Sequence, residues 1–205
     1  TYDVKVLQQV YASCEEIEKK VNNYDVTYKK LYTAIENMYE RNIDFDLLKL
    51  ISTQDFSRIA ASGNITYYLK EGTYPDGIKE GKGLAVYKNN FIYYGDWKDG
   101  KRSGRGIWLV SSLTSGGLNY YIYNGYWSDD LPNGKGMVIS VKSYGKKDEV
   151  YTATSGSFIK GLENGTMNME KKQAGSLIGS MKYTVKNGVP VSLKDSSGKS
   201  ITTVD

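Results

Sequence analysis

The sequence lacks most of the side chains that enzymes use. Its 205 residues contain no histidine and a single cysteine, Cys14. The absence of histidine removes the usual general base near neutral pH, the commonest zinc ligand, and the Ser-His and Cys-His nucleophile pairs. Cys14 alone cannot form an internal disulfide or a multi-thiolate metal site. The sequence therefore predicts a protein that is not an enzyme and has no metal or cofactor site.

Acidic pairs are the remaining candidates for catalysis or metal binding: Asp44/Asp46, Asp129/Asp130 and Asp148/Glu149. A glycosidase needs two carboxylates a few ångströms apart in a cleft, which neighbours in sequence do not establish. Turn chemistry explains Asp129-Asp130, because aspartate tolerates the backbone conformation of a tight turn. The sequence has no phosphate-binding fingerprint that opens a helix and no nucleic-acid module, so we expect no nucleic-acid partner.

Tyrosines and a basic turn are candidates for binding. The chain has 19 tyrosines, and a tyrosine can pack its ring while its hydroxyl stays hydrated. Four tyrosines outside the repeating core positions are predicted to line an exposed surface that suits a peptide, a helix or a sugar ring: Tyr94, Tyr120, Tyr121 and Tyr126. Four basic residues at one turn are either an anion-binding patch or a solvated turn: Lys98, Lys101, Arg102 and Arg105.

Residues 1–62 are predicted to be helical. Apolar residues recur there at steps of three and four, which is typical of one apolar helix face: Val4, Leu7, Tyr11, Cys14, Ile17, Val21, Tyr24, Tyr28, Leu31, Ile35 and Met38. An Asn-Asn-Tyr-Asp stretch at 22–25 favours an interruption. A coiled-coil-like helix that supports a homo-oligomer and a helical hairpin both fit, and we expect some apolar helix face to pack on the sheet that follows.

A glycine and aromatic repeat begins after residue 62. Its clearest copy, residues 93–106, reads YYGDWKDGKRSGRG. Successive copies are 23, 30, 31 and 23 residues apart, counted from Gly72 to Gly95, Gly125, Gly156 and Gly179. A period of 23 with two insertions predicts a repeat array with two elongated hairpins that project beyond the regular sheet.

The repeat-defining residues are Gly72, Tyr74, Gly77, Gly81, Gly83, Tyr93, Gly95, Trp97, Gly100, Gly104, Gly106, Tyr123, Gly125, Trp127, Gly134, Gly136, Gly156 and Phe158. Side chains alternate along a strand, so Tyr93, Gly95 and Trp97 share one face. Asp99-Gly100 suits a hairpin turn. Gly104 and Gly106 on the return strand leave a flat strip on which a ring can lie. One hairpin alone is marginal, so the units must be stabilised by stacking.

This pattern resembles the MORN (membrane occupation and recognition nexus) repeat, whose core reads Tyr-x-Gly-x-Trp-x-x-Gly-x-x-x-Gly-x-Gly. The resemblance covers roughly residues 66–190 and leaves residues 1–62 unrecognised. The expected fold is α+β: a helical segment at 1–62, then a single-layer antiparallel β-meander of about five MORN-type hairpins at 63–190. A C-terminal tail is expected at 191–205.

The predicted function is a non-catalytic interaction scaffold with a protein partner. The alternative is an envelope-associated module that binds anionic lipid or cell-wall glycan, because the family name refers to membranes. Residues 63–205 carry 19 basic and 13 acidic groups, a net charge of +6, which is only mildly basic. The sequence begins at Thr1, so we interpret it as a fragment or a processed form. The sequence leaves the localisation open; a membrane-anchored or extracellular protein whose targeting segment has been removed fits.

Overall fold

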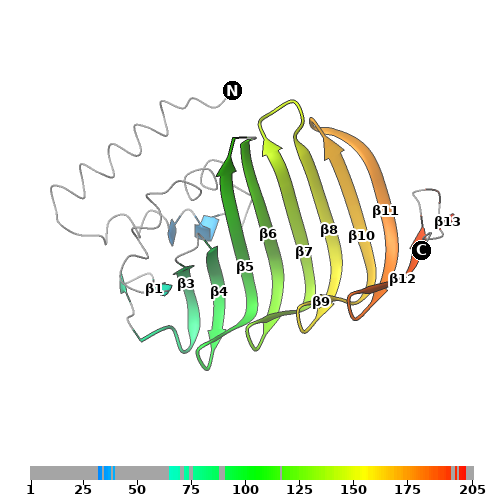
Figure 1. The fold of residues 1–205 in the computed structure, drawn as a ribbon. Helices are drawn as coiled ribbons and strands as arrows, with labels where there is room; N and C mark the ends of the chain where they lie inside the picture. The colour runs from blue at the N-terminus through cyan, green and yellow to red at the C-terminus, as the bar shows by residue number, and fades with distance from the viewer. Residues whose placement is uncertain are drawn as a thin grey trace.

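The computed structural model describes residues 32, 33, 35–37, 39, 65–69, 72, 73, 76–87, 91–115, 117–194, 197 and 199–201. Within this part of the chain the strands form one 13-stranded sheet (Figure 1). From β3 to β8 and from β10 to β13 each strand pairs antiparallel with the next along the chain, and β10 pairs with β8. The predicted antiparallel meander is therefore confirmed.

The strands are β1 (Ile65–Leu69), β2 (Gly72–Thr73), β3 (Gly81–Tyr87), β4 (Phe91–Lys98), β5 (Lys101–Thr114), β6 (Gly117–Ser128), β7 (Leu131–Tyr144), β8 (Val150–Ile159), β9 (Leu162–Glu163), β10 (Gly165–Gln173), β11 (Ser176–Lys186), β12 (Val189–Lys194) and β13 (Ser200–Ile201). Residues 191–194, which the sequence assigns to a C-terminal tail, belong to β12. β12 pairs with β11, so the sheet extends past the predicted boundary.

Two-residue turns join the strands along one edge of the sheet, at the bottom of Figure 1. We call this edge, formed by residues 99–100, 129–130, 160–161 and 187–188, the turn edge. Both residues of each turn have positive φ, for example 52° at Asp99 and 77° at Gly100. Such turns match the right-handed twist of paired strands. The turn predicted at Asp99-Gly100 is confirmed, and Asp130, with φ of 67°, occupies the position of a turn glycine.

Hydrogen bonds connect neighbouring turns across the unit boundaries. The amide of the second turn residue donates to a carbonyl oxygen of the preceding unit: Gly100 to Lys79 (3.1 Å), Asp130 to Arg102 (3.1 Å), Gly161 to Pro132 (2.8 Å) and Gly188 to Glu163 (2.9 Å). At three of these turns the amide of the first residue donates to a side chain of the preceding unit: Asp99 to Glu80, Lys160 to Asn133 and Asn187 to Asn164. The turn edge therefore holds the units at a constant offset.

The two insertions lengthen strands inside the sheet. β5 has 14 residues and β6 has 12, and they pair from Gly104 with Trp127 to Thr114 with Gly117. β7 pairs with β6 as far as Leu118 and Tyr144. The elongated hairpins are present. They do not project beyond the sheet as separate elements, in contrast to the prediction, because the lengthened strands β5, β6 and β7 pair with one another.

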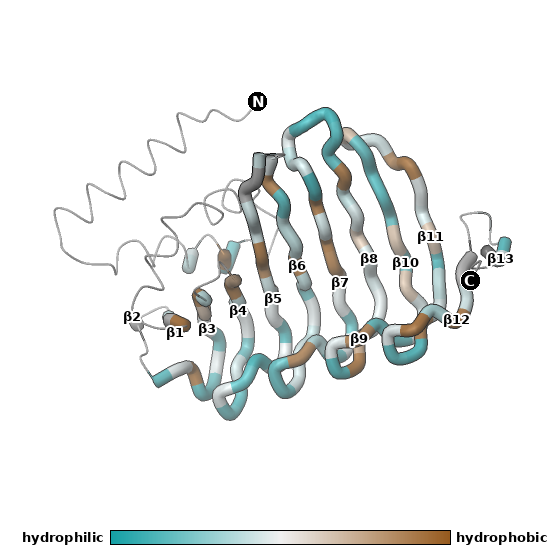
Figure 2. Tube along the Cα trace, in the orientation of Figure 1, coloured by the Kyte–Doolittle hydropathy of each residue, from teal (hydrophilic) through white to brown (hydrophobic). Residues whose placement is uncertain are grey.

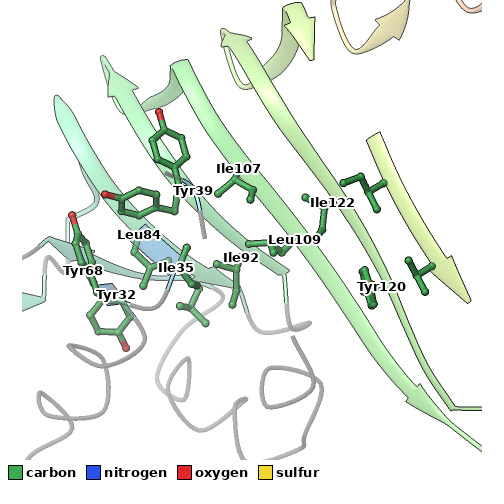
Figure 3. Close-up of a cluster of buried hydrophobic side chains, with 14 of the residues drawn as sticks. Tyr32, Ile35, Tyr39, Tyr68, Leu84, Ile92, Ile107, Leu109, Tyr120 and Ile122 are labelled. Carbon is green, nitrogen blue, oxygen red and sulfur yellow. The ribbon is translucent and has the colours of Figure 1, made fainter. Parts of the chain in front are cut away.

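The two sheet faces carry different apolar clusters, since side chains alternate along each strand. Figure 2 shows hydrophobic residues of the central strands spaced between hydrophilic ones. We call one face the ladder face: it bears Tyr93, Trp97, Tyr123, Trp127 and Phe158. We call the opposite face the covered face: it bears Leu84, Ile92, Tyr94, Ile107, Leu109 and Ile122. These side chains pack with Tyr32, Ile35 and Tyr39, which precede the sheet in the sequence (Figure 3).

Six residues of the predicted helical segment are described, and all six are helical: Tyr32, Thr33, Ile35, Glu36, Asn37 and Tyr39. Tyr32, Ile35 and Tyr39 are buried in the cluster of the covered face. Their spacing of three and four residues places them on one helix face, so the expected packing of a helix face on the sheet is observed here. A helical segment over all of 1–62 is not confirmed, because the other residues lie outside the described part of the chain.

The first unit departs from the predicted alignment. β1 pairs with β3 through Tyr68 and Leu84, whereas Gly72 pairs with Leu69 in β2. Gly72 therefore does not face Gly83 in the way that Gly95 faces Gly106. Leu69 and Ile78 pack next to Gly83 instead. These two aliphatic side chains fill the space that a tyrosine ring occupies in later units. Tyr74 lies outside the described residues.

The last unit has a different register from the one predicted by counting 23 residues from Gly156 to Gly179. Its turn is at Asn187-Gly188, so Val185, two residues before the turn, holds the position of Phe158. Val185 is buried in the same cluster as Phe158. The sequence misleads here because an aliphatic side chain replaces the aromatic one.

Candidate binding surfaces of the sheet

A row of glycines crosses six neighbouring strands. The paired glycines are Gly83 with Gly95, Gly95 with Gly106, Gly106 with Gly125, Gly125 with Gly136 and Gly136 with Gly156. Tyrosine rings lie against this row: a Cβ built on Gly106 would come within 2.5 Å of the Tyr93 ring, and one on Gly136 within 2.7 Å of the Tyr123 ring. The glycine row therefore provides a strip for ring packing, as predicted for Gly106. The same prediction was wrong for Gly104, which has a φ of 57° and lies against the Asp96 side chain instead of a ring.

Aromatic rings form a continuous ladder above the glycine row. Neighbouring centroids are 5.1–5.6 Å apart in edge-to-face contacts, an arrangement that stabilises aromatic pairs: Tyr67 with Trp97, Trp97 with Tyr93, Tyr93 with Trp127, Trp127 with Tyr123 and Tyr123 with Phe158. Trp97 and Trp127 are 4% and 6% exposed. The ladder is thus the core of the repeat and not a ligand site.

The two units that carry both a tyrosine and a tryptophan satisfy the polar atoms of these rings in the same way. The indole nitrogens of Trp97 and Trp127 donate to the carbonyl oxygens of Gly83 and Gly106 at 3.1 and 3.0 Å. The Tyr93 hydroxyl donates to the carbonyl oxygen of Asp96 at 2.8 Å, and the Tyr123 hydroxyl makes the equivalent bond. The indole bonds link each of these units to the one before it, because the glycine acceptor belongs to the preceding unit, whereas the tyrosine bonds lie within one unit.

The four basic residues of the predicted patch do not lie on one surface. The Arg102 guanidinium lies on the ladder face, 4.8 Å from the Trp108 ring centroid and 5.0 Å from that of Trp127. The Arg105 guanidinium lies 4.6 Å from the Tyr39 ring centroid, on the covered face. Lys101 pairs with Asp129 at 3.3 Å, and Lys98 is exposed. A convergent anion-binding patch needs several cations on one face, and this arrangement divides them.

Arg102 also holds the next turn of the array. Its Nε lies 3.2 Å from Asp130 Oδ1, its Nη2 donates to the Asp130 carbonyl oxygen at 2.9 Å, and its backbone amide donates to the same carboxylate at 2.8 Å. The aspartate that replaces a turn glycine therefore binds an arginine that covers the ladder. The sequence suggests the turn role of Asp130 but not this second contact.

Arg102→Ala is expected to destabilise the protein by about 1–2 kcal/mol, because it removes the contacts with two indoles and the bonds to Asp130. Arg102→Lys should recover only part of this, since an ammonium cannot reproduce the planar fork. Lys101→Ala is the matched control and should change stability by less than about 0.5 kcal/mol, because its ion pair is exposed. Thermal unfolding followed by circular dichroism measures both; equal midpoints for Arg102→Ala and Lys101→Ala would contradict the assigned role.

Two of the four tyrosines predicted to be exposed are buried. Tyr94 is fully buried and Tyr120 is 4% exposed, so placing them on an exposed surface was wrong. Alternation along the strand gives the face of Tyr94 correctly, but it does not show that the face is covered. Tyr121 and Tyr126 are 43% and 51% exposed. They lie on opposite faces, because Tyr121 is two residues from Tyr123 and Tyr126 pairs with Arg105.

The best-defined contact between the covered face and the helical residues is at Tyr94. Its ring lies 5.3 Å from the rings of both Tyr32 and Tyr39, edge to face. Its hydroxyl donates to Glu36 Oε1 at 3.2 Å. Burial, together with the neighbouring Tyr32 hydroxyl and the Glu36 carboxylate, raises the pKa of Tyr94. Lys82 Nζ lies 5.1 Å from the Tyr39 ring centroid, beside Arg105.

The packed tyrosines predict alkaline unfolding. Burial raises the pKa of Tyr87, Tyr123 and Tyr183 from 10.0 to about 12. Because the folded pKa is the higher one, the neutral phenols contribute stability that is fully present below about pH 10 and is lost as pH rises toward about 12. We expect the β-sheet circular dichroism to fall in this window together with a rise in tyrosinate absorbance. Ionisation of most tyrosines before any change in circular dichroism would contradict this coupling.

The described residues contain no group of three or more metal-ligating side chains that could hold an ion. No helix within the described ranges is long and apolar enough to cross a membrane.

The glycine row, the ring ladder and the linked turns define a repeat protein built from stacked β-hairpins. The chain contains MORN repeats: the MORN repeat family matches residues 93–109 and 123–141, the two units in which the ladder carries both tyrosine and tryptophan. A comparison with curated proteins gave no match. MORN repeats commonly serve as binding modules.

Proposed function

We propose that this chain is a non-catalytic protein-interaction module whose covered face binds an amphipathic helix of a protein partner. The packing of Tyr32, Ile35 and Tyr39 on that face supports the proposal, because it is a helix seated on the sheet through one apolar stripe. Recognition of an amphipathic helix through anchors three, four and seven residues apart is a recurring binding mode.

The contacts define the chemistry of the helix. Two aromatic residues seven positions apart contact the Tyr94 ring, and a fully buried aliphatic residue, Ile35, lies between them. One turn after the first aromatic residue, Glu36 accepts the hydrogen bond from Tyr94. The sheet contributes Lys82 and Arg105 next to the second ring. A partner helix of the same kind therefore carries Tyr, Ile and an acidic residue at these spacings.

The chain's own residues occupy this site, so a partner has to compete with an intramolecular ligand. A tethered ligand has a high effective concentration, which lowers the apparent affinity of the competitor. Weakening the internal contact should increase binding of a helix added from outside.

Ile35→Asp in the full chain tests this competition. A fluorescent synthetic peptide of residues 28–42 should bind weakly to the unmodified chain and at least about tenfold more tightly to the Ile35→Asp chain, because a buried carboxylate disfavours internal docking. The same peptide carrying Ile35→Asp should not bind. Fluorescence anisotropy measures the affinity, and circular dichroism verifies that the sheet is intact.

Thr33→Asp is the matched control, because Thr33 is an exposed residue of the same helical stretch. It should leave peptide binding as weak as in the unmodified chain. If the Ile35→Asp chain keeps its sheet and binds no more peptide than the Thr33→Asp chain, the proposed helix-binding role is wrong.

A further inference from the structure

The ladder face carries a second surface feature, far along the strands from the turn edge. An open hollow of about 260 Å³ lies over β5, β6 and β7. Six of its lining residues fall on the ladder face, two from each strand: Val110, Ser112, Asn119, Tyr121, Ser140 and Lys142. Strand pairing aligns Val110 with Tyr121 and Tyr121 with Ser140, so Tyr121 is at the centre of the row.

The size and polarity of the hollow limit what fits. Pockets for drug-sized ligands measure about 300–1,000 Å³, so 260 Å³ gives room for a single ring. The six residues on the ladder face combine a tyrosine ring and an aliphatic side chain with two serine hydroxyls, one amide and one ammonium. Alternation directs the side chains of the other three lining residues, Ser111, Tyr120 and Val141, to the covered face. A purely apolar ligand would leave these polar groups without partners, which is unfavourable.

Asn119 is held in place by the backbone. It lies where the pairing of β6 and β7 shifts register between Leu118 and Tyr120, and its Oδ1 accepts a hydrogen bond from the Ser143 amide at 3.0 Å. This contact uses the amide oxygen, so the two N–H donors of the side chain can serve a ligand. The irregular strand pairing thus fixes a donor at the rim of the hollow.

The lining contains no carboxylate. Two acidic residues of the adjacent loop are used within that loop, where Asp148 accepts from the Ser143 hydroxyl and Glu149 from the Gly145 amide. Glu163, which interacts electrostatically with Tyr121, accepts a hydrogen bond from the Tyr183 hydroxyl. Within this lining a cationic ligand would meet no carboxylate, and an anion would meet only Lys142, which is exposed. Hydroxyls that both donate and accept, next to one aromatic ring, match a neutral polyol ring with an apolar C–H face.

We propose that this hollow binds one pyranose ring of a neutral glycan. Tyr121 packs against the C–H face of the sugar, and Ser112, Asn119 and Ser140 hydrogen-bond its hydroxyls. The site lies on the opposite face from the helix-binding surface and does not depend on that proposal.

Amide NMR of the full chain titrated with chitotriose, cellotriose, maltotriose and trigalacturonic acid at millimolar concentrations tests the site. We expect a neutral trisaccharide to produce saturable shifts at residues 110–112, 119–121 and 140–142. Tyr121→Ala should weaken this binding by about tenfold, whereas Tyr121→Phe, which keeps the ring, should retain it. Tyr126→Ala is the matched control, because Tyr126 is similarly exposed on the other face, and it should have no effect.

Ser140→Ala gives a second test that leaves the aromatic packing intact, and it should also weaken sugar binding. The absence of saturable shifts at these residues with all four sugars would overturn the proposal, as would binding that Tyr121→Ala and Ser140→Ala leave unchanged. A response to trigalacturonic acid alone would overturn the assignment to a neutral ring.

Discussion

Gly95→Ala is expected to abolish the folded sheet, although it adds a single methyl group. A Cβ at Gly95 would lie 2.4 Å from the Cα of Gly106 and 2.5 Å from the carbonyl oxygen of Arg105. Both are backbone atoms of the paired strand, so no side-chain rotation can relieve the contact. Overpacking a core usually costs about 1–3 kcal/mol; here two strands must separate, and we expect a loss of roughly 4 kcal/mol or more.

Urea unfolding followed by circular dichroism measures this effect, and Gly125→Ala provides an independent replicate. At Gly125 the Cβ would lie 2.5 Å from the Cα of Gly136. Gly179→Ala is the matched control: no atom lies within 4 Å of its Cβ, so the change should be neutral or stabilise by up to about 1 kcal/mol. Equal stability of the Gly95→Ala and Gly179→Ala proteins would show that the glycine row has no packing role.

Trp127→Ala is the second substitution with a large expected effect, a loss of about 3–5 kcal/mol. Trp127 contacts the rings of both Tyr93 and Tyr123 at 5.2 Å, so its removal breaks the ladder between two units. It also leaves the Gly106 carbonyl oxygen without the indole donor and Arg102 without one of its rings.

Trp127→Phe separates ring packing from hydrogen bonding. Phenylalanine already holds the equivalent position at Phe158, where it contacts Tyr123 at 5.1 Å. We therefore expect Trp127→Phe to cost only about 1–2 kcal/mol, mainly from the lost donor to Gly106. Urea midpoints of the two variants that agree within error would contradict the division between packing and hydrogen bonding.

The hairpins could be predicted from sequence because each one depends on local signals. Asp99-Gly100 indicates the turn, and the alternation of Tyr93, Gly95 and Trp97 indicates one strand face. Repetition of these signals at a fixed offset then predicts a meander. Prediction failed at Gly72 and at the fifth unit, where Leu69, Ile78 and Val185 take positions that aromatic residues hold elsewhere. An aliphatic side chain can fill the same space in the core, but the aromatic residue that identifies the repeat is then missing from the sequence motif.

The candidate surfaces could be predicted less well, because exposure depends on contacts between distant residues. The alternation of side chains along a strand places Tyr94 on the opposite sheet face from Tyr93. Whether the face that bears Tyr94 is covered depends on Tyr32 and Tyr39, about 60 residues earlier in the sequence. The basic turn looked continuous in sequence, yet alternation sends Arg102 and Arg105 to different faces. The bonds between turns had a visible signal in the polar residues Glu80, Asn133 and Asn164, each three positions after the second turn residue.

The linked turns also explain how units of unequal length fit in one array. The repeated hydrogen bonds between units lie along one edge, so that edge sets the spacing, and strands can grow at their other ends without disturbing it. Both elongated hairpins turn at those other ends, between β5 and β6 at 114–117 and between β7 and β8 at 144–150. The hollow over β5 to β7 lies in this added region. The turn edge thus keeps a constant structure that holds the units together, whereas the opposite ends of the strands can vary in length and form new surface.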